Sequence, residues 1–189
     1  MEVLHTLHMD LCGPMRVQSI HGKRYILVIV DDYLRFTWVK FLRSKDETPK
    51  FVIKFLKQVQ VGLNKTVRFI QTDNDIEFVN QVLTEFYESV DITHQKSVMR
   101  TPQQNGVVER RNRTLVEVTR TMLIFFKALM FLWAETVATA CYTKKRSLIH
   151  THHNKTPYEL VHGKKPDLKF LRVLVLFVIL QMTAKILEN

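Results

Sequence analysis

RTPQQNGVVERRNR, residues 100–113, is a polar turn with one glycine that leads directly into a basic helix carrying a single acid, Glu109. Upstream, an apolar strand-like run ends in Thr-Asp-Asn at residues 72–74, and 35 residues lie between Asp73 and Glu109. A third carboxylate, Asp10, lies in a strand-like stretch of alternating apolar residues near the start of the chain. We interpret the rest of the sequence as the scaffold that brings these three acids together.

The net charge of +10 is unevenly distributed along the 189 residues. Residues 1–95 hold 12 Lys/Arg and 12 Asp/Glu, whereas residues 96–189 hold 16 and 6. The whole excess lies in the half that contains Glu109, which predicts a polyanionic partner such as nucleic acid on that side. A solvated basic surface would account for the charge equally well. The apolar content of 46% and charged content of 24% are ordinary for one globular domain.

The cysteines, the N-terminus and the apolar segments indicate in which cellular compartment we expect the protein. Cys12 and Cys141 are far apart in the sequence and form no CxxC motif, which is typical of a reducing environment. The N-terminus has no signal-peptide pattern, so we expect an intracellular protein, nuclear or cytoplasmic, that is not secreted. Residues 122–142 are the most membrane-like stretch, but Lys127 and Glu135 interrupt it, and a charge near the bilayer centre costs about 2.5 to 3.5 kcal/mol. We expect two core helices there and no membrane partner.

The hydrophobic periodicity alternates between that of strands and that of helices. It predicts strands at residues 4–11, 25–30, 36–42, 67–70 and 92–94, and helices over 44–63, 79–90, 107–127 and 131–147. A further short helix is expected to begin at Pro157. Ser44 is a candidate N-cap of the first helix, and Gly62 lies near its C-terminal end. Asp31 and Asp32 are assigned to the turn of a hairpin. This order of elements predicts an α/β layer architecture.

The three acids have the chemistry of a divalent-metal site. Magnesium takes oxygen ligands and is usually held by one or two carboxylates while it keeps waters and phosphate oxygens. Two such ions activate the attacking oxygen and stabilise the leaving oxygen in phosphoryl transfer. Asp10 and Asp73 at strand ends and Glu109 on a helix over the same edge would converge on such a site. The alternative is that these are turn or N-cap acids, since the chain holds 18 acids and Asp is common after strands.

Basic and amide side chains surround Glu109 in the sequence. Asn105 and Arg113 lie one helical turn on either side of it. Arginine and asparagine are residue types that hold nucleic-acid backbones and touch base edges. The candidate DNA-binding residues are Asn105, Arg110, Arg111, Arg113, Lys144, Lys145 and Arg146.

At this point a family resemblance is clear. The sequence between about residues 4 and 172 resembles the catalytic core of copia-type LTR retrotransposon integrases, in the retroviral integrase family; the matching segments are MDLCGPM, VDDYLRFTWVKFL, TDN followed by EF, TPQQNGVVERRNRTL and NKTPYEL. The resemblance implies a ribonuclease H-like α/β fold with a mixed five-stranded sheet flanked by helices. It also implies Mg²⁺ or Mn²⁺ dependence and insertion of the element's DNA into target DNA, with homo-oligomers in the full-length integrase. The positions that match the family's catalytic and metal-binding acids are Asp10, Asp73 and Glu109.

Two departures from the family pattern stand out. Asp75 occupies the position that is usually Gly, and it adds a carboxylate beside the proposed metal site. A calcium loop over Asp73, Asp75 and Glu77 is rejected, because Phe78 stands where that loop needs Gly. The second departure is the sequence after residue 172, and we hypothesise that residues 173–189 are an out-of-frame tail. We accordingly divide the chain into a catalytic core at 1–150, an extension of the core at 151–172, and this tail.

Two other interpretations compete with an active integrase core. The first is a catalytically inactive, nucleic-acid-binding remnant of a decayed retrotransposon polyprotein, which would keep the fold but lack the flanking modules for assembly; the presence of all three acids leaves activity open. A plain ribonuclease H is disfavoured by residues 101–113. The histidines of residues 150–153 are interpreted as a polar loop, not as a metal site.

Overall fold

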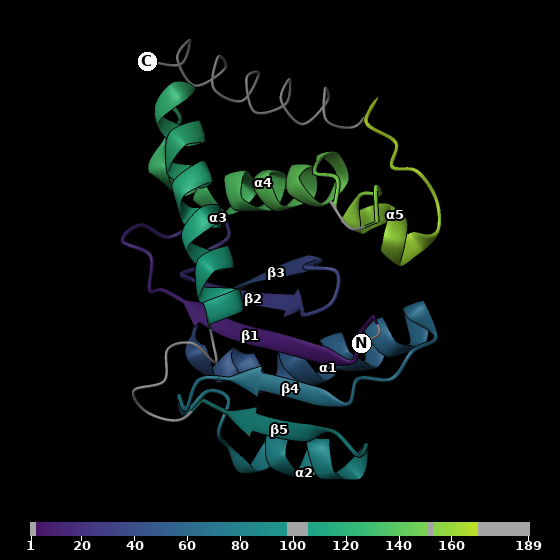
Figure 1. Ribbon diagram of the computed structural model, residues 1–189. Helices are drawn as coiled ribbons and strands as arrows, with labels where there is room; N and C mark the ends of the chain where they lie inside the picture. The colour runs from purple at the N-terminus through teal and green to yellow at the C-terminus, as the bar shows by residue number, and fades with distance from the viewer. Residues whose placement is uncertain (1–2, 98–105, 151–152, 170–189) are drawn as a thin grey trace.

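A five-stranded mixed sheet forms the centre of the computed structural model, which describes residues 3–97, 106–150 and 153–169 (Figure 1). The strands are β1 (Thr6–Cys12), β2 (Tyr25–Asp31), β3 (Thr37–Leu42), β4 (Phe69–Thr72) and β5 (Thr93–Lys96), in the spatial order β3-β2-β1-β4-β5. The β1–β2 and β2–β3 pairs are antiparallel, whereas β1–β4 and β4–β5 are parallel. The predicted α/β class, the mixed sheet and the hairpin at residues 25–42 are confirmed.

Helices cover both faces of the sheet. They are α1 (Thr48–Leu63), α2 (Gln81–Ser89), α3 (Gly106–Phe125), α4 (Trp133–Ser147) and α5 (Pro157–His162), with short 3₁₀ turns at Lys45–Glu47 and Met130–Leu132. In Figure 1, α3 crosses the strands at a steep angle and α4 lies beside it over the β2–β3 end, whereas α1 and α2 lie toward β4 and β5. Each helix matches a predicted one to within a few residues.

Two apolar cores, one on each face, explain why the second strand is apolar throughout. Leu27 and Ile29 of β2 pack in the core that includes α1 and α2, whereas Ile26, Val28 and Val30 pack against α3 and α4. Successive side chains of a strand point to opposite faces, so a strand covered on both sides must be apolar at every position.

The start of the first long helix differs from expectation, whereas its end agrees with it. Ser44 precedes the first 3₁₀ turn, but its side chain makes no capping hydrogen bond. Gly62 lies in the last turn of α1, as expected, and the C-cap is Asn64, which has a left-handed backbone. Asparagine accepts this conformation because its short polar side chain tolerates positive φ. At α5 the prediction is confirmed, with Thr156 and Glu159 forming a capping box before Pro157.

The β2–β3 turn is held by a buried acid, as its assignment to a hairpin turn predicted. The two carboxylate oxygens of Asp31, which is fully buried, accept from the backbone N–H groups of Leu4 and Leu34, each at 2.7 Å. Asp32 is more exposed and pairs with His8 and Arg35, each at 3.0 Å. The turn is therefore tied both to the start of the chain and to β1, the strand that carries Asp10.

Replacing Asp31 with alanine is expected to lower the free energy of unfolding by about 3 kcal/mol, because it leaves two buried backbone donors without an acceptor. Asp32→Ala is the matched control at the same turn, and we expect a loss of about 1 kcal/mol or less from this partly exposed ion pair. Urea denaturation followed by circular dichroism measures both. Equal losses for the two variants would contradict the assigned role of Asp31.

Within the described ranges, no helix has the length and apolar character needed to cross a bilayer. His150 and His153 lie in the loop before α5, as expected. Asn105, His152 and residues 173–189 lie outside the described residues, as do residues 151–152 and 170–172 of the proposed extension at 151–172.

Candidate catalytic and nucleic-acid-binding site

Asp10 lies on the central strand and faces α3. Its carboxylate accepts a hydrogen bond from the side-chain amide of Asn112, a buried residue of α3. Burial raises the pKa of Asp10, the hydrogen bond from Asn112 offsets part of this rise, and the negative charges of Glu109 and Asp75 add to it. Asp10 is thus fixed in orientation and lies within electrostatic reach of two further acids.

Asp73 follows β4 directly, at the same edge of the sheet. The parallel register pairs His8 of β1 with Gln71 of β4, so continuing it by two residues sets Asp10 beside Asp73. Adjacent strands are about 4.8 Å apart, which makes the two carboxylates near neighbours. Burial raises the pKa of Asp73 to about 6, with contributions from the charges of Asp75 and Asp10. This is the strongly perturbed acid expected of a functional site.

Glu109 lies in the first turn of α3 and is exposed. Its charge acts on Asp10, so the helix brings the third predicted acid to the edge that already holds Asp10 and Asp73. Among the described residues, no group of three or more His, Cys, Asp or Glu side chains is arranged as it stands to hold one metal ion. The donor set fits Mg²⁺ in chemistry, because it consists of carboxylate oxygens whose mutual repulsion a cation would relieve.

The charges of Asp75 and Glu77 both raise the pKa of Asp73, but Glu77 also has an ion-pair partner. Glu77 is buried and accepts from Lys45 Nζ at 2.8 Å, so its charge is balanced by an ion pair. Asp75 is exposed, and its charge raises the pKa of both Asp73 and Asp10. The backbone at Asp75 is not left-handed, so replacing the family's Gly here carries no conformational cost of that kind. Asp75 therefore affects the site through its negative charge.

The predicted DNA-binding cations of α3 and α4 occupy different environments. Arg110 and Arg113 are exposed on α3, whereas Arg111 is half-buried and donates from Nη2 to the Arg35 carbonyl at 3.1 Å. A groove of about 520 Å³ beside α3 is lined by Arg35, Arg110, Arg111 and Lys144 together with Gly106, Val107 and Thr114. It has four cations and no acid in its lining, which suits a nucleic-acid backbone.

Lys145 and Arg146 have aromatic partners that sequence reasoning did not anticipate. The ammonium of Lys145 lies 4.9 Å from the centre of the Phe36 ring. The guanidinium of Arg146 lies 3.6 Å from the Tyr142 ring centre and 4.2 Å from that of Tyr158. These cation–π contacts join the end of α4 to β3 and α5, so both residues have a structural role in addition to their charge.

Asn112 is the residue of the site that sequence reasoning missed. It lies three positions after Glu109, and residues three apart are neighbours on one helix face. The sequence feature that could have revealed it is an amide residue at helical spacing from the apolar Val108 and Leu115, with which it shares the buried face of α3. A buried amide needs a hydrogen-bond partner, and Asp10 is that partner.

The raised pKa of Asp73 predicts how the stability of the metal-free protein depends on pH. The folded state holds the proton more tightly than the unfolded chain, so the stabilising contribution is complete below about pH 4 and is lost as pH rises through about 6. In a chelating buffer, the unfolding free energy of the wild type should fall over this interval relative to that of Asp73→Asn. Asp75→Asn should reduce the effect, because it removes a charge that raises the pKa. Parallel pH profiles for the wild type and Asp73→Asn would contradict the prediction.

The sheet order and the flanking helices define the ribonuclease H-like fold of integrase catalytic cores. The HTLV-2 integrase catalytic core domain in complex with magnesium superimposes with a TM-score of 0.62 at 22% identity, covering 84% of this chain and 97% of that one. The simian T-cell lymphotropic virus intasome in complex with the PP2A regulatory subunit B56 gamma gives 0.66 at 21% identity, covering 87% and 56%. The predicted ribonuclease H-like fold is confirmed.

Sequence comparison identifies the family. Residues 2–102 match the family model for the integrase core domain, and the chain belongs to that family. The Pol polyprotein from transposon TNT 1-94 of Nicotiana tabacum is 37% identical over 147 residues, covering 78% of this chain and 11% of its own length. The Pol polyprotein of radiation murine leukemia virus (strain Kaplan) is 32% identical over 150 residues, covering 79% and 25%. The predicted relationship to copia-type retrotransposon integrases is confirmed, and the chain spans about a tenth of the retrotransposon polyproteins that it matches.

Proposed function

We propose that this chain is the catalytic core of a retrotransposon integrase that carries out divalent-metal-dependent phosphoryl transfer on DNA. The proposal is supported by electrostatic coupling between the predicted acids, since the charge of Glu109 acts on Asp10 and that of Asp10 acts on Asp73, and by a groove lined by cations beside α3. Membership of the integrase core family supports it. We assign the catalytic core to residues 1–150 and an extension of that core to residues 151–172.

The three acids would hold Mg²⁺ or Mn²⁺ through their carboxylate oxygens. The bound metal supplies charge stabilisation to the attacking and leaving oxygens of the phosphodiester. Asn112 keeps the Asp10 carboxylate oriented toward the site by donating its amide hydrogen. The charge of Asp75 adds negative potential at the same edge, which favours a cation and opposes an approaching phosphate.

Two reactions follow from this arrangement, and they differ only in the nucleophile. In 3′-end processing, a water oxygen attacks phosphorus and the 3′ oxygen of the adjoining nucleotide leaves with a proton. In strand transfer, the 3′-hydroxyl of the element's end attacks a phosphodiester of the target DNA, forming one P–O bond as another breaks. Arg110 and Lys144 would hold the DNA backbone along the groove, and Arg113, exposed on the same helix as Arg110, would add a contact outside its lining. Neither reaction needs a covalent enzyme intermediate.

We also infer that the active form is a multimer. Solved cores of HTLV-2 integrase with magnesium include a dimeric and a trimeric form. Insertion of both element ends into target DNA requires two active sites in one assembly, and it would take place in the nucleus.

The test is a metal-dependent disintegration assay on the purified chain with a branched DNA substrate. We expect a joined product in Mg²⁺ or Mn²⁺, none in chelator, and loss of the product in Asp10→Asn. Asp46→Asn is the matched control, because Asp46 is an acid of the η1 turn (Lys45–Glu47) to which we assign no role in the site. DNA binding without any metal-dependent product would overturn the proposal in favour of the inactive, nucleic-acid-binding remnant.

A further inference from the structure

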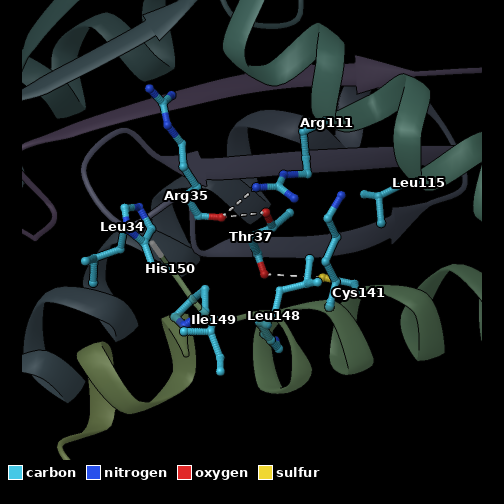
Figure 2. A pocket seen from close by; sticks show the side chains of 12 residues that line it. Leu34, Arg35, Thr37, Arg111, Leu115, Cys141, Leu148, Ile149 and His150 are labelled. Carbon is cyan, nitrogen blue, oxygen red and sulfur yellow. Dashed lines mark hydrogen bonds between the residues drawn. The ribbon is translucent and has the colours of Figure 1, made fainter. Parts of the chain in front are cut away.

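A second, smaller cavity lies between the β2–β3 turn, α3 and α4, and Asp10, Asp73 and Glu109 are not among its lining residues (Figure 2). Its volume is about 150 Å³. Leu34, Leu115 and Leu148 provide apolar wall, and Arg111, Lys144 and Lys145 provide positive charge. The cavity is below the size of drug-sized ligand sites, which start at about 300 Å³, so it suits a small charged group.

Arg111 is the best-fixed cation of this cavity. Figure 2 shows its guanidinium directed at the Arg35 carbonyl, which accepts from Arg111 Nη2 at 3.1 Å and from the Thr37 hydroxyl at 3.2 Å. Arg35 has a left-handed backbone with φ of 54°. The guanidinium is thus anchored by one of its five N–H groups, and the others remain to donate to a ligand.

The three cations share the cavity without a neutralising acid. In the described parts of the chain, no carboxylate lies within ion-pairing distance of Arg111, Lys144 or Lys145. Burial lowers the pKa of each of the three, and the charge of Arg111 lowers that of Lys144 further. Partly buried like charges destabilise the folded state, and a bound anion would remove that cost.

The cavity adjoins the basic groove beside α3. The two share Arg35, Arg111 and Lys144 in their linings. A nucleic-acid strand that follows the groove would therefore carry its phosphates past the mouth of the cavity. Apolar walls exclude water around such a phosphate and strengthen its attraction to the cations.

We propose that this cavity is an anchoring site for a backbone phosphate of DNA, with Arg111 and Lys144 as the donors and Lys145 as an additional charge. The inference rests on the proposed function in taking DNA as the partner, but it does not require catalysis. It gives DNA a point of attachment at Arg111 and Lys144, separate from the acids, so that DNA would be held while its reactive bond lies at Asp10, Asp73 and Glu109.

The first measurement uses inorganic phosphate as the probe. At constant pH and ionic strength, replacing chloride by phosphate should raise Tm of the wild-type chain by about 2 to 4 °C. Lys144→Gln and Arg111→Lys should lose most of this shift. Lys54→Gln is the matched control, since it removes an exposed cation from α1 on the opposite face of the sheet and should keep the shift.

The second measurement is DNA affinity by fluorescence anisotropy with a duplex oligonucleotide in chelator, over a series of salt concentrations. Lys144→Gln should weaken binding by about fivefold and reduce the slope of log K against log salt by about 1, with a smaller change in Lys54→Gln. Because affinity is measured in chelator, where no metal-dependent reaction proceeds, a failure of catalysis leaves this test unaffected. A phosphate shift with DNA affinity unchanged in Lys144→Gln would show a small-anion site only and overturn the proposal. Absence of the phosphate shift in the wild type would overturn it too.

Discussion

Glu109→Gln is expected to abolish metal-dependent DNA joining while leaving DNA binding intact. The glutamine side chain keeps the shape of glutamate but loses its charge, and an NH₂ donor replaces one of the two carboxylate oxygens. If one carboxylate contributes about 4 kcal/mol to the transition state through its metal, the rate should fall about a thousandfold. The exposed first-turn position of Glu109 on α3 means that the substitution should not disturb the core.

Glu117→Gln provides the matched control for this substitution. Glu117 is an exposed acid of the same helix, about two turns further from the sheet edge, and carries no assigned role. We expect its joining rate to stay within about twofold of the wild type, as for a surface substitution. The measurement is the initial rate of product formation in Mn²⁺ at matched DNA occupancy. Comparable rates for the wild type and Glu109→Gln would remove Glu109 from the catalytic site.

Phe78→Ala is expected to produce a large loss of stability, about 4 kcal/mol in the free energy of unfolding. Phe78 is fully buried and belongs to the core formed by β1, β4, α1 and α2. Its backbone N–H donates to the Asp75 carbonyl at 3.0 Å, which makes it the anchor of the turn that follows Asp73. The cavity left by the ring would therefore loosen the segment that positions one of the three acids.

Ile76→Ala separates this effect from a general sensitivity of the turn. Ile76 is two residues away, and 83% of it is exposed to solvent. Its substitution should change the unfolding free energy by no more than about 0.5 kcal/mol. Urea denaturation monitored by tryptophan fluorescence and circular dichroism gives both values. A loss below about 1 kcal/mol for Phe78→Ala would show that the ring does not anchor this turn.

The elements that position Asp10 and Asp73 were predictable because their signals are local. Residues 25–30 and 36–42 are short apolar runs separated by a turn, and they form the hairpin of β2 and β3. Asp73 comes directly after a strand because the apolar run ends there. In these segments the propensity of the chain and the burial of the sheet favour the same conformation.

The electrostatic part of the site was only partly predictable. The sequence placed the acids on elements that meet at one edge, but not Asn112 as the partner of Asp10. That contact joins residues 102 positions apart, so it depends on how α3 crosses β1. The roles of the three acids as metal ligands stay predictions.

What the sequence by itself determined was the order of the elements, the positions of Asp10, Asp73 and Glu109 on them, and the basic character of the second half of the chain. Only the tertiary structure decided which cations face the groove and which are stacked, because Arg111 meets the Arg35 carbonyl and Arg146 meets Tyr158 through contacts distant in the sequence. Local patterns depend on neighbouring residues and can be read along the chain. The partner of a long side chain depends on packing between layers, which no single segment contains.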